Sequence, residues 1–210
     1  MRPWLCLRWA RIPFEERLIR LDQVGYGKQA IAEVVAVTPN GRVPALNAGG
    51  LLLWDSLAIA EWAAEEAPQA ALWPSDRRVR AEARAVVAEM HSGFPAVRRD
   101  LSMNIRRRVS VKDWPAETVI ELARIDDLLG GLRTRFRGAG PWLFGARTIA
   151  DAFYAPVATR LRTYGVKLSA PAQSYCDAVF GDADFLAWED ASIPNSWDAS
   201  GYSVIDGMYA

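Results

Sequence analysis

The spacing of apolar residues along the chain predicts helices in its second part. From Ser75 onward, apolar residues recur every three or four positions, which is the period of one face of a helix. This stripe contains Val79, Ala83, Val86, Met90, Phe94, Val97, Leu101 and Ile105. Pro95 lies inside the stripe and is expected to kink the helix. Further helices are expected over residues 115–136, 148–164 and 171–180, the second of them starting with the pattern of a capping box.

The first 70 residues consist of shorter segments with different periods. A short apolar helix is expected over residues 4–11, because Pro13 then ends it. Residues 14–21 alternate apolar and polar side chains, with Leu18 inward, as in a half-buried strand. A glycine-containing turn at 25–27 and a short helix over 28–37 should follow.

A hairpin and a capped helix are expected next. Residues 47–50 have turn chemistry and lead into the short apolar strand 51–54, which predicts a hairpin. Asp55 or Ser56 then starts a helix that ends before Pro68. The prediction for the whole chain is a small α/β domain over residues 1–70, followed by an all-helical domain over residues 75–210 with an acidic, aromatic tail.

Composition excludes some classes of protein and the charge distribution suggests one contact. The 210 residues are 51% hydrophobic and 24% charged, so the chain can bury a core and is not disordered as a whole. Because 25 basic and 25 acidic side chains cancel, nothing in the net charge indicates a nucleic-acid or membrane-surface partner. All 25 basic residues lie within residues 1–167, whereas residues 168–210 hold seven acidic ones. An acidic end folding onto a basic body is the simplest interpretation.

Cysteine and histidine are too few for a disulfide framework or a zinc site. Cys6 and Cys176 are the two cysteines, and His91 is the single histidine. No apolar run is long enough for a membrane span. Arginines at positions 2, 8 and 11 interrupt any signal-peptide core, which predicts a cytoplasmic protein.

Several motifs in order along the chain resemble the cytosolic glutathione S-transferase superfamily. RVPAL at 42–46, LLLWDSLAIAEW at 51–62 and TIADAF at 148–153 carry this resemblance. RPWLCLRWARIPFEE and EMHSGFPAVRRDLSMNIRRR are similar to segments of bacterial zeta-like members. The resemblance implies a thioredoxin-like domain followed by a helical one, which agrees with the division above, and glutathione as co-substrate without a metal.

The resemblance also implies a glutathione site. Pro44 matches the cis-proline that turns the Val43 backbone toward the cysteinyl group of glutathione; the alternative is an ordinary trans proline in a loop. Asp55 and Ser56 match the pair that holds the γ-glutamyl end at a helix N-terminus, although helix capping alone explains both residues. Arg42 is a candidate for the glycyl carboxylate, or else a solvated loop residue.

One part of the zeta-like pattern does not lie within the sequence. The family has a first strand and a serine-rich turn, and one of these serines stabilises the glutathione thiolate. Met1 and Arg2 match the residues that follow this turn, so the catalytic serine is expected before Met1. The chain therefore looks shortened at its N-terminus, which would leave the strand at 14–21 without a neighbour on one side. Cys6 is a poor replacement because its apolar neighbours predict burial.

The resemblance places the second substrate against the helical domain. His91, Met103, Asn104 and Arg106 match that pocket; a structural role for the histidine and a solvated helix end for the arginine are the alternatives. The expected function is conjugation or isomerisation of a small electrophile by the glutathione thiolate, in a homodimer, as in detoxification enzymes. The rival hypothesis is a binding or interaction protein that keeps the fold without the chemistry.

Overall fold

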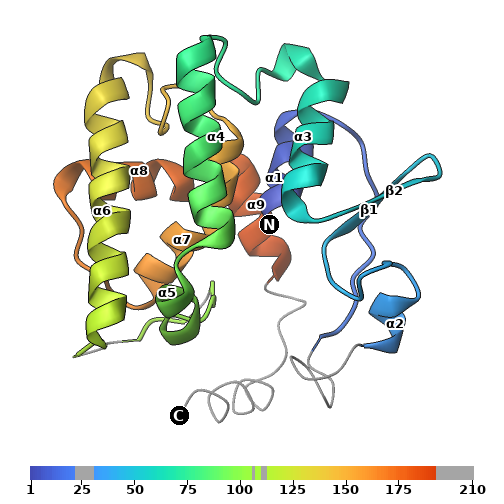
Figure 1. Cartoon of the computed structure of the whole chain (residues 1–210), viewed down its shortest axis with the longest axis horizontal. Helices are drawn as coiled ribbons and strands as arrows, with labels where there is room; N and C mark the ends of the chain where they lie inside the picture. The colour runs from blue at the N-terminus through green and yellow to red at the C-terminus, as the bar shows by residue number, and fades with distance from the viewer. Residues whose placement is uncertain (22–30, 106, 110–112, 193–210) are drawn as a thin grey trace.

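The computed structural model describes residues 1–21, 31–105, 107–109 and 113–192, which form mostly helices (Figure 1). The predicted turn at 25–27 lies outside the described residues. The elements in chain order are α1 (Arg2–Trp9), α2 (Ala32–Val35), β1 (Ala45–Ala48), β2 (Leu51–Trp54), α3 (Ser56–Glu66), α4 (Arg77–Ser92), α5 (Pro95–Asp100), α6 (Ala116–Phe136), α7 (Ile149–Thr163), α8 (Ala170–Phe180) and α9 (Ala183–Ser192). The hairpin and α2 lie at one end of the molecule and α6 at the other, with α1 and α3 between them (Figure 1).

The predicted hairpin is confirmed. Strands β1 and β2 pair antiparallel, with Ala45 opposite Trp54 and Ala48 opposite Leu51. The turn between them is closed by the Asn47 side chain, whose Oδ1 accepts a hydrogen bond from the Gly50 N–H at 2.9 Å. This local bond explains why asparagine suits the position. The hairpin leads directly into α3, so its geometry sets where that helix begins.

The strand predicted over residues 14–21 is wrong. Alternating side chains are not sufficient for a strand, because the backbone groups also need a partner strand. Among the described residues, β1 and β2 pair only with each other. Side chains hold the segment instead: the Trp4 indole donates to Glu16 at 2.8 Å and packs edge-on against Phe14. Leu18, predicted to point inward, is 66% exposed.

The helical stripe after Ser75 forms two helices rather than one kinked helix. Helix α4 starts at its cap Asp76 and ends at Gly93, where a Cβ would lie only 2.4 Å from the Glu89 carbonyl oxygen. Phe94 then adopts a left-handed conformation with φ +59° and starts α5. Glu121 of α6 accepts the N–H groups of the first two residues after Pro95, at 3.2 and 2.8 Å. This break redirects the chain, so the helix predicted to reach residue 105 stops at 100.

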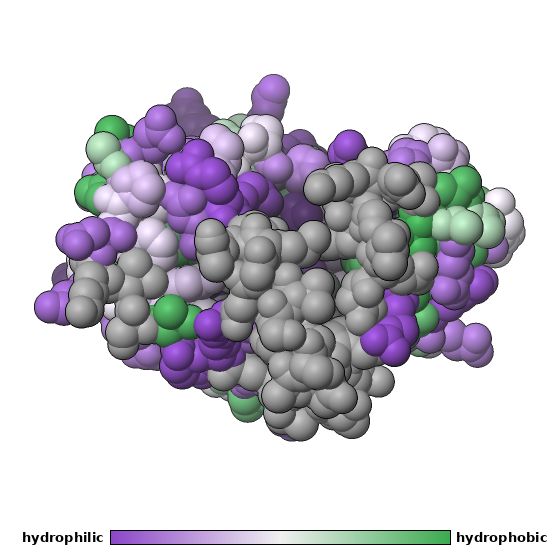
Figure 2. All heavy atoms as spheres, turned by 90° about the horizontal axis from the view of Figure 1, so that it is seen from below, coloured by the Kyte–Doolittle hydropathy of each residue, from purple (hydrophilic) through white to green (hydrophobic). Residues whose placement is uncertain are grey.

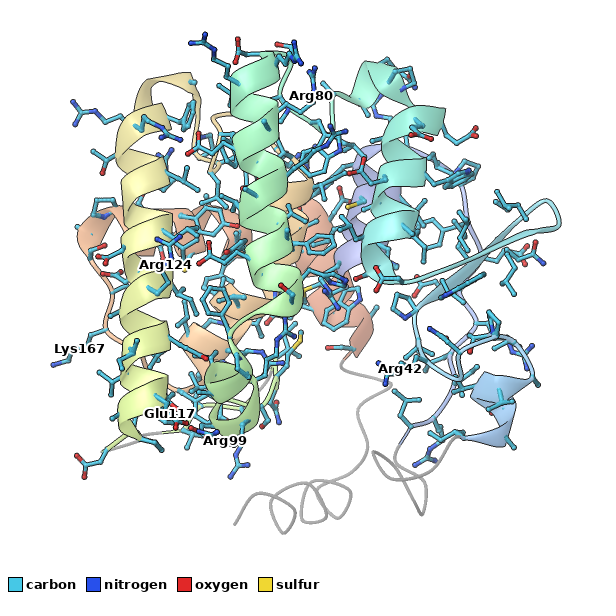
Figure 3. All side chains as sticks on the ribbon, viewed as in Figure 1. Arg42, Arg80, Arg99, Glu117, Arg124 and Lys167 are labelled. Carbon is cyan, nitrogen blue, oxygen red and sulfur yellow. The ribbon has the colours of Figure 1, made fainter. Side chains whose placement is uncertain are left out.

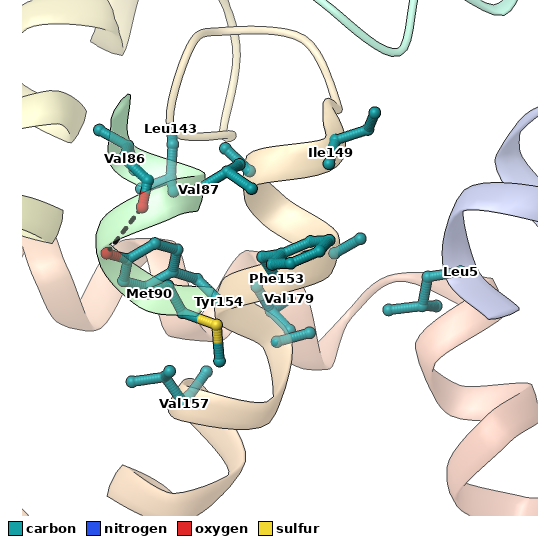
Figure 4. Packing of buried hydrophobic residues seen from close by; sticks show 14 of the residues in the cluster. Leu5, Val86, Val87, Met90, Leu143, Ile149, Phe153, Tyr154, Val157 and Val179 are labelled. Atoms are coloured by element: carbon teal, nitrogen blue, oxygen red, sulfur yellow. Dashed lines mark hydrogen bonds between the residues drawn. The ribbon is translucent and has the colours of Figure 1, made fainter. Parts of the chain in front are cut away.

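Helix α7 lies in the centre of the helical part. Thirteen of its residues are buried, and it packs against α1, α4 and α8. Figure 4 shows Tyr154 of α7 beside Val86 and Met90 of α4, with the Tyr154 hydroxyl donating to the Val86 carbonyl at 3.4 Å. The predicted capping box at its start is confirmed. The helices predicted around α6 and α8 are confirmed as well.

Helix α9 was not predicted, and it carries much of the acidic end of the chain. The Asp182 side chain caps it by accepting the N–H groups of Asp184 and Phe185 at 3.1 and 3.0 Å. Arg147 pairs with Asp182 at 2.8 Å, and Arg8 pairs with Asp184 at 2.9 Å. For these residues the prediction that the acidic end folds onto basic side chains is confirmed. No helix within the described ranges has the length and apolar character needed to cross a membrane.

Candidate functional site

The loop before β1 contains a cis peptide bond between Val43 and Pro44, as predicted. The Val43 side chain is 48% exposed. Within the described part of the chain, the Val43 N–H and C=O have no hydrogen-bond partner. A backbone N–H and C=O that are both free can pair with an extended peptide in the manner of an added strand. The loop is therefore available for the strand-like contact expected of it.

Asp55 joins the hairpin to α3 in an unusual backbone conformation. Its φ is +77° and its ψ is +136°, and its Oδ1 accepts the Leu57 N–H at 2.7 Å. Such a conformation is rare for a residue with a Cβ and is found where the surroundings hold it in place. The predicted role of Asp55 as the N-cap of α3 is therefore confirmed. The side chain is still 45% exposed, which leaves part of the carboxylate open to solvent.

Ser56 is the first residue of α3 and is 1% exposed. Its Oγ has no hydrogen-bond partner among the described atoms. A buried hydroxyl is nearly always paired, because an unpaired one costs about 1–3 kcal/mol. The orphaned hydroxyl lies at a helix N-terminus, where the free N–H groups attract an anion. Ser56 therefore has the chemistry to hold a carboxylate.

Arg42 lies on the same loop as Val43 and is exposed. Its backbone N–H donates to Thr38 Oγ1 and Asn40 Oδ1, both at 3.1 Å, and these bonds fix the start of the loop. Figure 3 shows the Arg42 side chain projecting from this loop, away from α2. The guanidinium has no ion pair with any described residue, so its charge is available.

His91, predicted for the second-substrate pocket, contacts Asp55 of the predicted glutathione site. Its Nε2 is 3.2 Å from Asp55 Oδ2, and its Nδ1 is 3.1 Å from the Arg2 guanidinium. The Phe153 ring packs edge-on against the imidazole, with centroids 5.9 Å apart, and the Arg2 guanidinium lies 5.1 Å from the centre of the same ring. The structure thus joins a helical-domain residue to the predicted glutathione residues.

The family model "Glutathione S-transferase, N-terminal domain" matches residues 1–66. The chain is 33% identical over 144 residues to the maleylacetoacetate isomerase of Pseudomonas aeruginosa, covering 65% of this chain and 64% of the isomerase. It is 28% identical over 204 residues to the maleylpyruvate isomerase of a Ralstonia species, covering 91% and 92%.

Two solved structures agree with these relatives. One is a holo maleylpyruvate isomerase described as a bacterial glutathione S-transferase of the Zeta class, with TM-score 0.66, 23% identity and 88% of both chains covered. The chain is similar to the glutathione S-transferase superfamily, and to its zeta-like members in particular. The other is the maleylacetoacetate isomerase of Anaeromyxobacter dehalogenans with bound dicarboxyethyl glutathione and citrate, with TM-score 0.59, 26% identity and 89% and 86% covered.

The similarity to these proteins identifies the fold class. The part containing the hairpin corresponds to the thioredoxin-like portion of the glutathione S-transferase fold, and α4–α9 correspond to its helical portion. The relationship is to the zeta-like members, as the motifs implied. The relatives are named as isomerases, one solved structure among them as a glutathione S-transferase, and the first relative is matched over just under two-thirds of its length.

Two arginines bring positive charge to the candidate site near His91. Burial, and to a lesser degree the charge of Arg98, lowers the pKa of Arg2 below its ordinary value. Arg98 reaches back from α5 and donates from its Nε to the Gly93 carbonyl at 2.9 Å. Two neighbouring guanidinium groups create a local field that favours an anion. Sequence reasoning did not place Arg2 or Arg98 in the site, although Arg2 lay within a motif that carried the resemblance.

Neither cysteine suits thiolate chemistry. Cys6 is 0% exposed, and burial raises its pKa well above the ordinary value of a thiol. Burial likewise raises the pKa of Cys176 to about 12. A thiol with such a pKa stays protonated and is a poor nucleophile. The described residues also contain no cluster of three or more His, Cys, Asp or Glu side chains suited to a metal ion.

The remaining predicted pocket residues lie in an irregular segment after α5. Met103 is partly buried, and Asn104 accepts the Thr163 hydroxyl on its carbonyl oxygen and the Arg107 N–H on its Oδ1 at 3.0 Å. These bonds attach the segment to the end of α7. Arg106 lies outside the described residues. A role for Met103, Asn104 and Arg106 toward the second substrate stays a prediction.

Proposed function

We propose that the protein uses glutathione to conjugate or isomerise a small electrophile that carries carboxylate groups. The observation that carries the proposal is the buried, unpartnered hydroxyl of Ser56 at the N-terminus of α3. It lies beside the half-exposed carboxylate of Asp55, and the cis Val43–Pro44 loop precedes the hairpin.

Each end of glutathione has a matching group in this proposal. The γ-glutamyl carboxylate binds the Ser56 hydroxyl and the free N–H groups of α3, while its ammonium binds Asp55. The cysteinyl backbone pairs with Val43, next to Pro44. The glycyl carboxylate binds the guanidinium of Arg42, which has no ion pair among the described residues. When bound, glutathione supplies a thiolate nucleophile, and no described side chain is assigned to stabilise it.

The positive field of Arg2 and Arg98 supports an anionic electrophile. Two relatives are named for maleyl compounds, and one neighbour was crystallised with dicarboxyethyl glutathione. A double bond conjugated to a carboxyl or keto group accepts a thiolate at carbon, and the electron pair moves onto the carbonyl oxygen. Rotation about the former double bond and expulsion of the thiolate give the isomer, whereas protonation at carbon gives the conjugate. Guanidinium groups suit the carboxylates of such substrates.

Calorimetric titration with glutathione, and loss of maleylpyruvate followed spectroscopically, test this function together. Binding accompanied by turnover supports it. Ser56→Ala should weaken glutathione binding by about 1–3 kcal/mol, the usual value of a buried hydrogen bond to a charged group. Binding without turnover on any electrophile would support the non-catalytic rival, and an unchanged affinity in Ser56→Ala would remove that residue from the site.

A homodimer is part of the proposal. Leu51, Leu52 and Trp54 of β2 are 53%, 37% and 47% exposed, and they form an apolar strand at one end of the molecule. Figure 2 shows hydrophobic surface at the end that carries α2 and the hairpin. Apolar patches of this kind mark interfaces in soluble proteins. Sedimentation analysis of the native protein and of Trp54→Ser tests it, since the variant should shift toward monomer.

A cytoplasmic location completes the proposal. Cys6 and Cys176 are both unpaired and buried, which fits a compartment where thiols stay reduced. Fractionation of cells that produce the tagged protein tests this location.

A further inference from the structure

The hydrogen bonds of His91 determine which of its nitrogen atoms carries a proton. The Arg2 guanidinium lies 3.1 Å from Nδ1, and a guanidinium can only donate. Nδ1 is therefore the acceptor, and Nε2 carries the hydrogen of the neutral ring. Asp55 Oδ2 lies 3.2 Å from Nε2. His91 thus presents its Nε2 edge to the Asp55 carboxylate, with its orientation set from the other side by Arg2.

The Asp55 carboxylate is held at both oxygen atoms. Oδ1 accepts the Leu57 N–H at 2.7 Å, and Oδ2 faces His91. Each carboxylate oxygen has two acceptor positions, so each keeps one free for another donor. Because the side chain is 45% exposed, these free positions can be reached by a ligand.

The residues that hold His91 come from three other helices. Arg2 lies on α1, Asp55 at the start of α3, and Phe153 on α7, while His91 itself lies in the last turn of α4. Arg98 of α5 is the further charged group near Arg2. Phe153 is fully buried, so it provides a fixed wall for the imidazole. The position of the imidazole is therefore determined by packing as well as by polar contacts.

We propose that His91 is a positioning residue for glutathione, acting through Asp55. Its Nε2 edge, 3.2 Å from Asp55 Oδ2, holds the carboxylate in the orientation that receives the α-ammonium of the γ-glutamyl group. This inference rests on the proposed glutathione site and adds a dependence of that site on the helical part. A positively charged amine is the chemistry that such a half-paired carboxylate recognises.

The test compares glutathione with an analogue in which the γ-glutamyl amino group is replaced by hydrogen. His91→Leu should raise the Kd for glutathione about tenfold, the loss expected for one charge-assisted hydrogen bond that is no longer oriented. The Kd for the deamino analogue should stay within about twofold, because that analogue has no ammonium to place. His91→Gln should recover most of the affinity, since its amide can accept from Arg2 and donate to Asp55.

Ser92→Ala is the matched control on the same turn of α4, because the Ser92 hydroxyl donates only to the Ala88 carbonyl at 2.9 Å. It should leave both Kd values unchanged. Should His91→Leu fail to fold, His91→Asn replaces it, since its shorter side chain cannot span Arg2 and Asp55. Equal weakening toward both ligands, or no weakening, would overturn the positioning role. If the native protein binds neither ligand, the proposed function itself fails.

Discussion

Thr148 donates two hydrogen bonds to the same carboxylate oxygen of Asp151: its N–H at 2.7 Å and its hydroxyl at 3.1 Å. The other oxygen of Asp151 accepts the Leu143 N–H at 3.0 Å. Asp151 is 0% exposed, so these three bonds replace water entirely. The pair fixes the start of α7 and ties it to the loop before it.

Removing this carboxylate should be costly. Asp151→Ala leaves two buried N–H groups without acceptors, and each unsatisfied group costs about 1–3 kcal/mol. We expect the free energy of unfolding to fall by about 3–5 kcal/mol, measured by chemical denaturation. Asp127→Ala, at an exposed position of α6, is the control and should change it by less than about 0.5 kcal/mol. A loss below 1 kcal/mol in Asp151→Ala would contradict this reading of the cap.

The same carboxylate should make stability depend on pH. Burial raises the pKa of Asp151 to about 7 from the ordinary 3.8, against the opposing effect of its hydrogen bonds. The folded state then binds a proton more tightly than the unfolded state. This contribution is fully present below pH 4 and is lost as pH rises through 7. The unfolding free energy of the native protein minus that of Asp151→Asn should therefore decline from pH 4 to pH 7, and a rise would contradict the prediction.

Ser56→Ala, unlike Asp151→Ala, should not destabilise the ligand-free protein. Its hydroxyl is buried without a partner, so Ser56→Ala removes an unsatisfied group rather than a bond. We expect the melting temperature without glutathione to stay the same or increase by a few degrees. Thermal unfolding checks this, with Thr159→Ala for comparison. The buried Thr159 hydroxyl donates to the Ala155 carbonyl at 2.9 Å, so its removal should lower the melting temperature. A clear loss of stability in Ser56→Ala would mean that the hydroxyl has a partner in the ligand-free state.

The attachment of α9 should depend on Arg147. This arginine pairs with Asp182, whose side chain is 6% exposed, and it stacks on Trp9 at 5.2 Å. Arg147→Ala leaves that buried carboxylate without a counter-charge, at a cost of about 2 kcal/mol. The amides of α9 should then exchange faster with deuterium.

The matched control for α9 is Arg84→Ala. Arg84 also stacks on a tryptophan, Trp73, but its ion pair with Glu61 is 3.7 Å long and solvent-exposed. Exposed pairs contribute at most about 1 kcal/mol. Equal exchange in α9 for both variants would show that the Asp182 pair does not hold the helix.

Local patterns were enough to predict most helices and the hairpin. The capping box of Thr148 and Asp151 and the turn at Asn47 are short-range devices, so their residues identify them directly. The segment 14–21 could not be predicted in this way, since a strand depends on a neighbour elsewhere in the chain. Helix α9 was missed because its apolar residues do not follow one face. The cap at Asp182, three residues before the buried Phe185, is the signal that could have indicated it.

The candidate site was predicted in its parts but not in its connections. The resemblance pointed to Val43, Pro44, Asp55 and Ser56, and the cis bond was expected. The link from Asp55 to His91 joins residues 36 positions apart, and the link from His91 to Arg2 spans 89. No periodicity encodes such pairs, because they depend on how four helices pack.

Helix α1 has a further consequence during synthesis of the protein. It is made well before α7 and α9, which are among its partners, and Asp184, the ion-pair partner of Arg8, follows 176 residues later. Leu5 and Cys6, completely covered in the folded protein, are exposed on the nascent chain until those helices emerge. An apolar helix left uncovered for so long is a natural binding segment for chaperones, and it makes folding on the ribosome a late event.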